Sequence, residues 1–422
     1  MKNILRYTVA LLLAVAVGMG LLLLSTLLPQ DAIDRNVYAS AEKMQAEGNY
    51  PMYADYTLTA QLDNYTDAII LAQSKAMSSP EAILTNPMYQ LAEEDARNEG
   101  PVADLYAYVQ AEDPEPTSFY VRYWMGFRAV MRLMLSFADH YQLRRYLAAL
   151  VLGLALAAVC SVAKHINEKA AFIFGISFVF VRPYMVAMTP QFSCCFVIAF
   201  LAMLLMPRLA RRPELQGMTF YLLGITTMFF DFYTTPLITF GLPFVYLYLL
   251  SGEGETRKLK TLLKYFLLWG AGYLAMWFAK MVLTTLFTDV NGLENGLVSL
   301  LYRLGIRKEE SHTYQYSIFH SLRAIWFSLY ADEAGKRILA VLLGCGILAL
   351  GALLLKRRPK FSQLLEHRNL IAVAALPIIW MLAAPQPFNI HHWFQYRSIA
   401  LSFFSFGIYC LLTLAKPKEI TE

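Results

Sequence analysis

About ten stretches of apolar residues run along the chain, separated by shorter polar segments. A membrane-spanning helix needs about 20 mostly apolar residues. The pattern predicts spans at 5–28, 142–162, 169–188, 192–206, 218–233, 236–250, 262–287, 338–355, 370–384 and 398–415. Several are short or interrupted by proline, so nine to eleven spans fit the pattern. The first is too long for a signal-peptide core and lacks a small-x-small cleavage site, which favours an uncleaved anchor.

Two longer polar segments interrupt this pattern and divide the chain. The predicted parts are a first span (1–28), a large outer loop (29–141), spans two to seven (142–287), a second outer loop (288–335) and the last three spans with a short tail (336–422). Inside the loops the sequence predicts helices at 40–47, 81–97 and about 319–330. Residues 118–140 are apolar yet carry several arginines, which predicts a helix lying at the membrane interface. The predicted fold class is an all-α polytopic membrane protein.

Composition and charge support a membrane protein. The chain is 57% hydrophobic and 16% charged, against about 45–50% and about 25% in soluble proteins. This excludes an ordinary soluble enzyme, a disordered tail protein and a nucleic-acid binder as first interpretations. About half of the 36 basic residues lie in one alternate set of short loops, and about half of the 31 acids lie in the first outer loop. The positive-inside rule then predicts a cell-membrane protein with both termini cytoplasmic.

Arginines in the predicted interfacial helix are the first candidate for chemistry. Trp124, Arg128 and Arg132 recur every four residues and would share one helix face. Guanidinium groups bind phosphate bidentately, so one interpretation is a phosphate clamp. The other is that these side chains snorkel to lipid headgroups.

Carboxylates in the first outer loop are the second candidate. Asp63 and Asp67 are four residues apart, so on a helix both would face one way. They could hold a divalent metal ion or supply a general base. They could equally form a solvated helix start with Asp63 or Thr66 as the cap. Asp31 and Asp34 follow the first span directly and could act on a membrane-bound substrate or be an ordinary charged flank.

A carboxylate within an aromatic segment is the third candidate. Asp231 lies among Phe and Tyr residues, including Tyr233, near the outer end of a predicted span. An acid at such a position is costly unless it is paired or hydrated, which makes it a site hypothesis. Arg182 at similar depth and Lys280 are candidate partners. The alternative is a structural ion pair between helices.

The start of the last span carries His391, His392, Tyr396 and Arg397 close together. Adjacent histidines point in different directions on a helix, so they form no i, i+4 metal pair. The cluster could bind a phosphate or sugar, with one histidine as the acid–base group, or it could be part of an interfacial aromatic belt. Gly-rich phosphate loops, Gly-x-Ser-x-Gly and His-Glu-x-x-His are absent from the sequence, which argues against a nucleotide-driven motor.

The layout resembles the GT-C superfamily of membrane glycosyltransferases, with one long first outer loop, an interfacial helix and about ten spans. The segments 63–67 (DNYTD), 120–124 (YVRYW) with Gly126, 230–232 (FDF) and 394–397 (FQYR) also look like those of an uncharacterised family of bacterial multipass proteins, which implies no activity. The GT-C resemblance implies a polyprenyl-phosphate sugar donor. It further implies loop carboxylates that act as base or metal ligand. No Asp-x-Asp follows the first span, and Asp31-x-x-Asp34 is the nearest equivalent.

The leading hypothesis is therefore sugar transfer from a polyprenyl-phosphate donor to a cell-envelope glycan, lipid or protein. Membrane lipid and this donor are the expected partners, a divalent metal is a candidate cofactor, and nucleic acid is excluded. Asp63, Asp67 or the Asp31/Asp34 pair would deprotonate the acceptor. The donor phosphate would be neutralised by Arg128, Arg132, Arg182 and Arg397. The alternatives are a transporter or lipid flippase, and a non-catalytic scaffold of envelope assembly.

Overall fold

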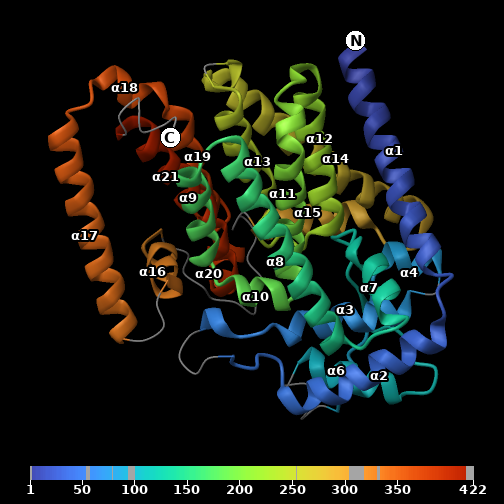
Figure 1. The fold of residues 1–422 in the computed structure, drawn as a ribbon. Coiled ribbons are helices and arrows are strands. Elements are labelled where there is room, and N and C mark those ends of the chain that lie inside the picture. The colour runs from blue at the N-terminus through green and yellow to red at the C-terminus, as the bar shows by residue number, and fades with distance from the viewer. Residues whose placement is uncertain are drawn as a thin grey trace.

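The computed structural model describes residues 2–53, 58–77, 79–93, 100–252, 254–303, 318–329 and 333–414. Figure 1 shows a bundle of long helices with a smaller group of helices packed under one end. Nearly all elements are helices, which confirms the predicted all-α class. The start of α1 (Lys2–Ser25) and the end of α21 (Ile399–Leu414) lie at the same end of the bundle (Figure 1).

Six described helical segments are long and apolar enough to cross a membrane, in keeping with a multipass membrane protein. They are Ile4–Ser25, His140–His165, Pro190–Leu209, Leu259–Phe287, Lys336–Arg357 and Ile390–Leu414. The helices that contain the first five are α1, α8 (His140–His165), α11 (Pro190–Leu209), α14 (Leu259–Phe287) and α17 (Glu333–Arg357). The sixth joins the end of α20 (Pro385–Gln395), η3 (Tyr396–Ser398) and α21. Shorter helices at other predicted spans are α12 (Pro213–Phe230), α13 (Leu237–Leu250) and α19 (Arg368–Ala383).

One predicted span is broken in the structure. The stretch 169–188 forms α9 (Glu168–Val179) and the short α10 (Pro183–Met188) instead of a single helix. Arg182 between them has a φ of 56°, a left-handed conformation that costs energy for a residue with a Cβ. Pro183 follows directly and disfavours a helical conformation at the preceding residue. The break turns the chain sharply, and α10 packs against α8.

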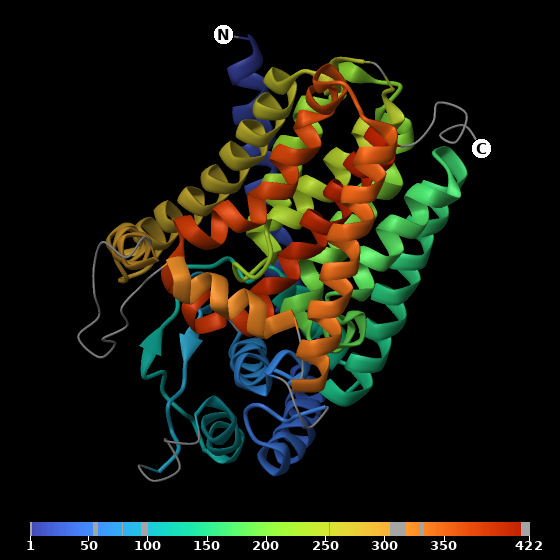
Figure 2. The same cartoon turned by 90° about the vertical axis from the view of Figure 1, so that its left-hand side faces the viewer.

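The segment predicted as the first outer loop folds into a small domain, here called the loop domain (residues 29–138). It contains the elements α2 (Gln30–Glu47), η1 (Leu58–Ala60), α3 (Asn64–Ala76), α4 (Pro80–Thr85), β1 (Pro87–Met88), α6 (Pro101–Gln110), β2 (Ser118–Phe119) and α7 (Phe127–Leu135). The strands β1 and β2 pair antiparallel, with Pro87 opposite Phe119. Figure 2 shows this hairpin beside the loop-domain helices, below the bundle.

Two loop-domain predictions were wrong. The helix predicted at 81–97 is not continuous, because Asn86 in a left-handed conformation ends α4 at Thr85 and Pro87 then starts β1. Residues 94–97 of this prediction lie outside the described residues. The single interfacial helix predicted at 118–140 is only α7, preceded by β2 and a turn. Met125 in that turn has a φ of 54°, so Trp124 lies outside the helix and shares no helix face with Arg128. Outside the loop domain, the surface helix predicted near 319–330 is α16 (Ile318–Leu329).

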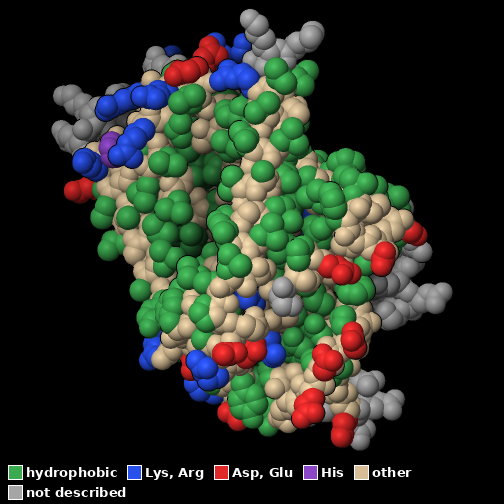
Figure 3. Space-filling view, turned by 90° about the vertical axis from the view of Figure 1, so that its right-hand side faces the viewer, with side chains coloured by type: hydrophobic (Ala, Val, Ile, Leu, Met, Phe, Trp, Pro, Cys, Tyr) green, Lys and Arg blue, Asp and Glu red, His purple; other side chains and the backbone are tan. Residues whose placement is uncertain are grey.

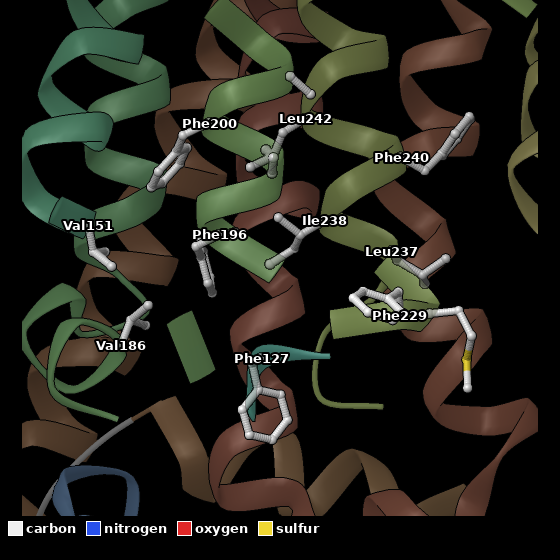
Figure 4. Packing of buried hydrophobic residues seen from close by; sticks show 14 of the residues in the cluster. Phe127, Val151, Val186, Phe196, Phe200, Phe229, Leu237, Ile238, Phe240 and Leu242 are labelled. Carbon is white, nitrogen blue, oxygen red and sulfur yellow. The ribbon is translucent and has the colours of Figure 1, made fainter. Parts of the chain in front are cut away.

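The bundle core is built from apolar side chains of α8, α11, α12 and α13 (Figure 4). Glycines allow α12 and α14 to approach closely. A Cβ on Gly224 would collide with the backbone carbonyl of Trp269, and one on Gly272 would collide with that of Tyr221. Small residues at facing positions are the usual way for membrane helices to pack closely.

The outer surface of the bundle is apolar over its middle. Figure 3 shows mostly hydrophobic side chains there, with charged groups gathered toward the two ends. The helix α17 stands at the side of the bundle (Figure 1), and its most apolar window has no buried residue. Such a distribution suits a chain whose middle faces lipid.

Candidate functional site

A set of buried polar side chains lies where the loop domain meets the bundle. We call it the junction site. Its members are Asp63, Asp67, His140, Arg144, Gln191, Asp231, Thr234 and Arg397, all of them buried. They come from α3 and its cap, the first turns of α8 and α11, the α12–α13 connection and η3.

Asp63 caps the start of α3 and is 2% exposed. Its carboxylate accepts hydrogen bonds from the Thr66 backbone N–H (3.1 Å) and hydroxyl (2.9 Å), and from Gln191 Nε2. The capping role fits one of the two sequence interpretations, but the helix start is buried rather than solvated. Burial and, to a lesser extent, the charge of Asp67 raise the pKa of Asp63 to about 7. A carboxylate with this pKa can accept a proton near neutral pH.

Asp67 is part of an ion-pair network with α8. Its Oδ2 lies 3.0 Å from His140 Nε2 and 3.6 Å from Arg144 Nη2. Arg144 also donates to Asn64 Oδ1, and Asn64 donates to Glu47 Oε2 at 3.0 Å. The start of α8 is fixed by a capping box in which Asp139 and Gln142 bond each other's backbone N–H. These contacts of Asp67 with His140 and Arg144 connect α3 to α8.

Asp231 and Asp63 are connected through Thr234 and Gln191. Asp231 ends α12 and accepts from the Thr234 hydroxyl at 2.6 Å. That hydroxyl lies 3.4 Å from the carbonyl oxygen of Gln191, whose side chain donates to Asp63. The expected partner Lys280 is elsewhere, donating to the carbonyl oxygens of Leu84 (2.6 Å) and Ile83 (3.2 Å).

Arg397 is the buried cation of the junction site, 1% exposed. Its Nη2 donates to the carbonyl oxygen of Thr59 at 3.2 Å, and its guanidinium carbon lies 4.4 Å from the centre of the Phe192 ring. Within the described part of the chain, its Nε and Nη1 and the Tyr396 hydroxyl have no hydrogen-bond partner. Asp63 and Arg182 are close enough to Arg397 for electrostatic interaction. Unpaired buried donors beside a carboxylate are costly unless a ligand uses them.

The other residues predicted near Arg397 are arranged around aromatic rings. Tyr233 has a φ of 68°, and the guanidinium carbon of Arg303 lies 4.4 Å from its ring centre. His391 breaks the helical conformation of α20 and lies 5.1 Å, centre to centre, from Phe394. The carbonyl oxygen of His392 is 3.5 Å from the Ser328 hydroxyl.

Arg128 and Arg132 lie outside the junction site, in a second group with Lys280 that we call the carbonyl cluster. Arg132 donates to the carbonyl oxygen of Ser25 (2.9 Å), to that of Ser74 (2.5 Å) and to Gln30 Oε1 (2.9 Å). Arg128 donates to the carbonyl oxygen of Ile83 at 3.1 Å. Both arginines have 0% exposure. They therefore face neither lipid headgroups nor an open phosphate site, and they bind the loop domain to itself and to α1.

The remaining loop carboxylates are on the surface. Asp31 is exposed in the first turn of α2. Asp34 lies 3.4 Å from Lys75 Nζ and accepts from Gln30 at 2.7 Å. No group of three or more His, Cys, Asp or Glu side chains suited to a metal ion occurs in the described ranges. A divalent metal ion at Asp63 and Asp67 therefore stays a prediction from the sequence.

Sequence reasoning missed Gln191, His140 and Arg144. A signal was present for Gln191, a polar residue after Pro190 at the start of an apolar stretch. His140 and Arg144 are one turn apart at the start of α8, a spacing that places both on one helix face.

Comparison with protein-family models, curated proteins and solved structures gives no match for this chain. The function is therefore argued from the junction site itself.

Proposed function

We propose that this protein is a multipass membrane glycosyltransferase that uses a polyprenyl-phosphate-linked sugar at the extracytoplasmic face. In this proposal the chain crosses the cell membrane about ten times and both termini are cytoplasmic. Support comes from the ends of α1 and α21, which lie at the same end of the bundle (Figure 1). The short loops at that end are rich in Lys and Arg, and cytoplasmic loops favour these residues.

The observation that carries the proposal is that Asp63 and Arg397 are both buried in the junction site and close enough to interact electrostatically. Asp63 is a buried carboxylate with a pKa raised to about 7 by burial and by Asp67. Arg397 is a buried guanidinium whose Nε and Nη1 have no hydrogen-bond partner among the described residues. Transfer from a sugar phosphate requires a base for the acceptor hydroxyl and a cation for the leaving phosphate. The free N–H groups of a guanidinium can bind that phosphate.

The proposed step needs no further reactant. The acceptor hydroxyl oxygen attacks the anomeric carbon of the sugar, and its proton passes to Asp63. The bond between the anomeric carbon and the phosphate oxygen breaks, and its electron pair leaves with the polyprenyl phosphate. Arg397 stabilises the negative charge that develops on that phosphate. The donor bond supplies the energy.

Other junction residues position these two groups. Gln191 orients the Asp63 carboxylate through its side chain. Thr234 and Asp231 hold the first turn of α11 from the other side. Asp67 has a structural role, because its contacts with His140 and Arg144 join α3 to α8. Arg182 lies near Arg397 and supplies a second positive charge. Tyr396 supplies a hydroxyl that has no hydrogen-bond partner among the described residues.

The test is transfer by purified protein in liposomes. Labelled polyprenyl-phosphate sugars are supplied with cell-envelope glycans, lipids and proteins as acceptors. The unaltered protein should transfer label, and Asp63→Asn should lower the rate by about 10²–10⁴-fold, the usual contribution of a general base. Asn is also a good N-cap, so the variant should fold. Glu112→Gln, at an exposed position of the loop domain, is the matched control and should retain the full rate.

The possible failures are distinguishable. No transfer by the unaltered protein with any donor would overturn the glycosyltransferase proposal and favour a scaffold. Movement of labelled lipid across the liposome membrane without transfer would favour a flippase. Full activity of Asp63→Asn would leave the reaction standing and overturn the role of Asp63.

A further inference from the structure

A lipid-sized groove runs along the outer face of α11. This helix packs against α8 on one side and α12 on the other. Two cavities lie along it, of about 950 Å³ and about 410 Å³, and Thr226 of α12 lines both. Figure 3 shows this side of the molecule, where apolar side chains border a hollow and basic side chains gather at its upper edge. The two cavities therefore form neighbouring parts of one groove.

The upper end of the groove is strongly basic. Lys164 at the end of α8, Arg208 at the end of α11, and Arg211 and Arg212 before α12 line the larger cavity. No Asp or Glu is among its lining residues. Within the described ranges no ion pair involves these four side chains, and all four are exposed. Four cations from the ends of three helices thus converge on one opening.

The rest of the groove is apolar and extends beyond the depth of one lipid leaflet, because its smaller part reaches Pro190 at the start of α11. Its larger part is lined by Leu204, Leu205, Leu222 and Leu223, and Val197 lies in the smaller part. From Val197 to Arg208 the helix rises about 16 Å at about 1.5 Å per residue. The hydrocarbon core of a bilayer is about 30 Å thick, so one leaflet is about 15 Å. An acyl chain whose headgroup lies beside Arg208 would therefore end near Val197.

We propose that this groove binds an anionic phospholipid of the leaflet at the basic end of the bundle. Its phosphate contacts Lys164, Arg208, Arg211 and Arg212, and its acyl chains lie along α11. Charge complementarity selects the anionic headgroup, because the opening presents cations without acids. The basic, phosphate-binding end of the groove is separate from the junction site and from the proposed transfer reaction, since Arg208 and Gln191 lie at opposite ends of α11.

Lipid retention measured by native mass spectrometry tests the proposal. The full chain in detergent is mixed with phosphatidylglycerol or with phosphatidylcholine of the same acyl chains. Phosphatidylglycerol should bind more tightly, and removing each basic side chain should weaken it about fivefold. The variant Arg208→Gln, Arg211→Gln, Arg212→Gln removes three of them. The variant Lys260→Gln, Lys264→Gln is the control, because it removes exposed basic residues of α14 that lie outside the groove.

A second variant tests the apolar part without altering charge. Leu205→Trp places a larger side chain in the groove, and it should reduce phosphatidylglycerol binding while the protein stays folded. Glycerol 3-phosphate has the headgroup phosphate but no chains, and it should not displace the bound lipid. Equal retention of the two lipids would overturn the proposal. So would unchanged binding by both groove variants, or displacement by glycerol 3-phosphate.

Discussion

The junction site and the carbonyl cluster both bury arginine, yet they differ in what the guanidinium groups contact. Arg132 uses Nε, Nη1 and Nη2 on three acceptors of the protein. Arg397 uses only Nη2, and within the described residues its Nε and Nη1 have no acceptor. Both side chains are almost completely inaccessible to solvent. Burial alone therefore does not separate a structural cation from a ligand-binding one.

The difference lies in how many donors the protein itself satisfies. A buried cation with all donors satisfied stabilises the contacts it makes, and its removal leaves several acceptors unpaired. A buried cation with free donors lowers stability unless a ligand completes it. Arg132, whose three guanidinium nitrogens all have acceptors, should therefore matter for folding, and Arg397 should matter for activity; Arg128 is intermediate, because its Nη1 has no partner among the described residues. Each prediction below tests one part of that contrast.

The largest effect is expected for Arg132→Ala. The substitution leaves the carbonyl oxygens of Ser25 and Ser74 without this donor, together with the Gln30 side chain. A buried group that loses its partner costs about 1–3 kcal/mol, and a typical protein is stable by only about 5–15 kcal/mol. The Ser25 carbonyl keeps the N–H of Leu28 at 3.4 Å, so the main loss is at Ser74. We expect loss of folded, monodisperse protein in size-exclusion chromatography. Arg122→Ala, on a partly exposed side chain of the same segment, should fold normally.

The opposite pattern is expected for Arg397→Gln. The protein loses one hydrogen bond to Thr59 and a cation above Phe192, while the two unpaired donors disappear. The thermal unfolding midpoint should change little. Transfer from the polyprenyl-phosphate donor should fall by about 10²–10³-fold, as for other groups that stabilise developing negative charge. If Arg397→Gln transferred sugar at the normal rate but had a clearly lower thermal unfolding midpoint, Arg397 would be a structural cation and not a ligand-binding one.

The protonation of Asp63 should be visible in the pH profile. Burial and Asp67 raise its pKa to about 7 in the folded protein, from about 3.9 in the unfolded chain. As a base it must be deprotonated, so the transfer rate should fall about tenfold per pH unit below about 7. A raised carboxyl pKa stabilises the fold most below pH 3.9, and this contribution is lost as pH rises through about 7. Asp63→Asn should therefore gain stability relative to the unaltered protein when pH is raised from 5 to 8, measured by thermal unfolding. A rate that is constant between pH 5 and 8 would contradict the base role.

The sequence predicted the helices better than it predicted their interruptions. The apolar pattern located α8, α14 and α16, because long apolar stretches report helices directly. It missed the break at Arg182 and the end of α4 at Asn86, where single residues adopt positive φ. The span 169–188 had enough apolar residues for one helix, so composition gave no sign of the turn that Arg182 and Pro183 produce.

The sequence singled out several residues of the candidate site, but it did not show which of them contact one another. Asp63, Asp231 and Arg397 were each singled out, and the fold brings them to one region. The residue that connects the two acids is Gln191, which lies 128 positions from Asp63 in the sequence. Arg132 and Arg397 look alike in sequence, since both stand among apolar and aromatic residues. Only the positions of Ser25, Ser74 and Thr59 distinguish a satisfied guanidinium from an unsatisfied one.

The smallest effect on stability and on activity is expected for Asp34→Asn, a substitution outside both the junction site and the carbonyl cluster. Asp34 belongs to the same domain as Asp63, but its side chain is 39% exposed and lies 3.4 Å from Lys75 Nζ. Surface ion pairs contribute about 0–1 kcal/mol, because water and salt already screen both charges. The unfolding midpoint and the transfer rate should both stay close to those of the unaltered protein. Added salt should change both quantities equally in the two proteins. A large loss of activity in Asp34→Asn would indicate that the reacting carboxylate lies on the surface of α2 and not in the buried junction site. The sequence analysis had named Asp34 as one of the candidate bases.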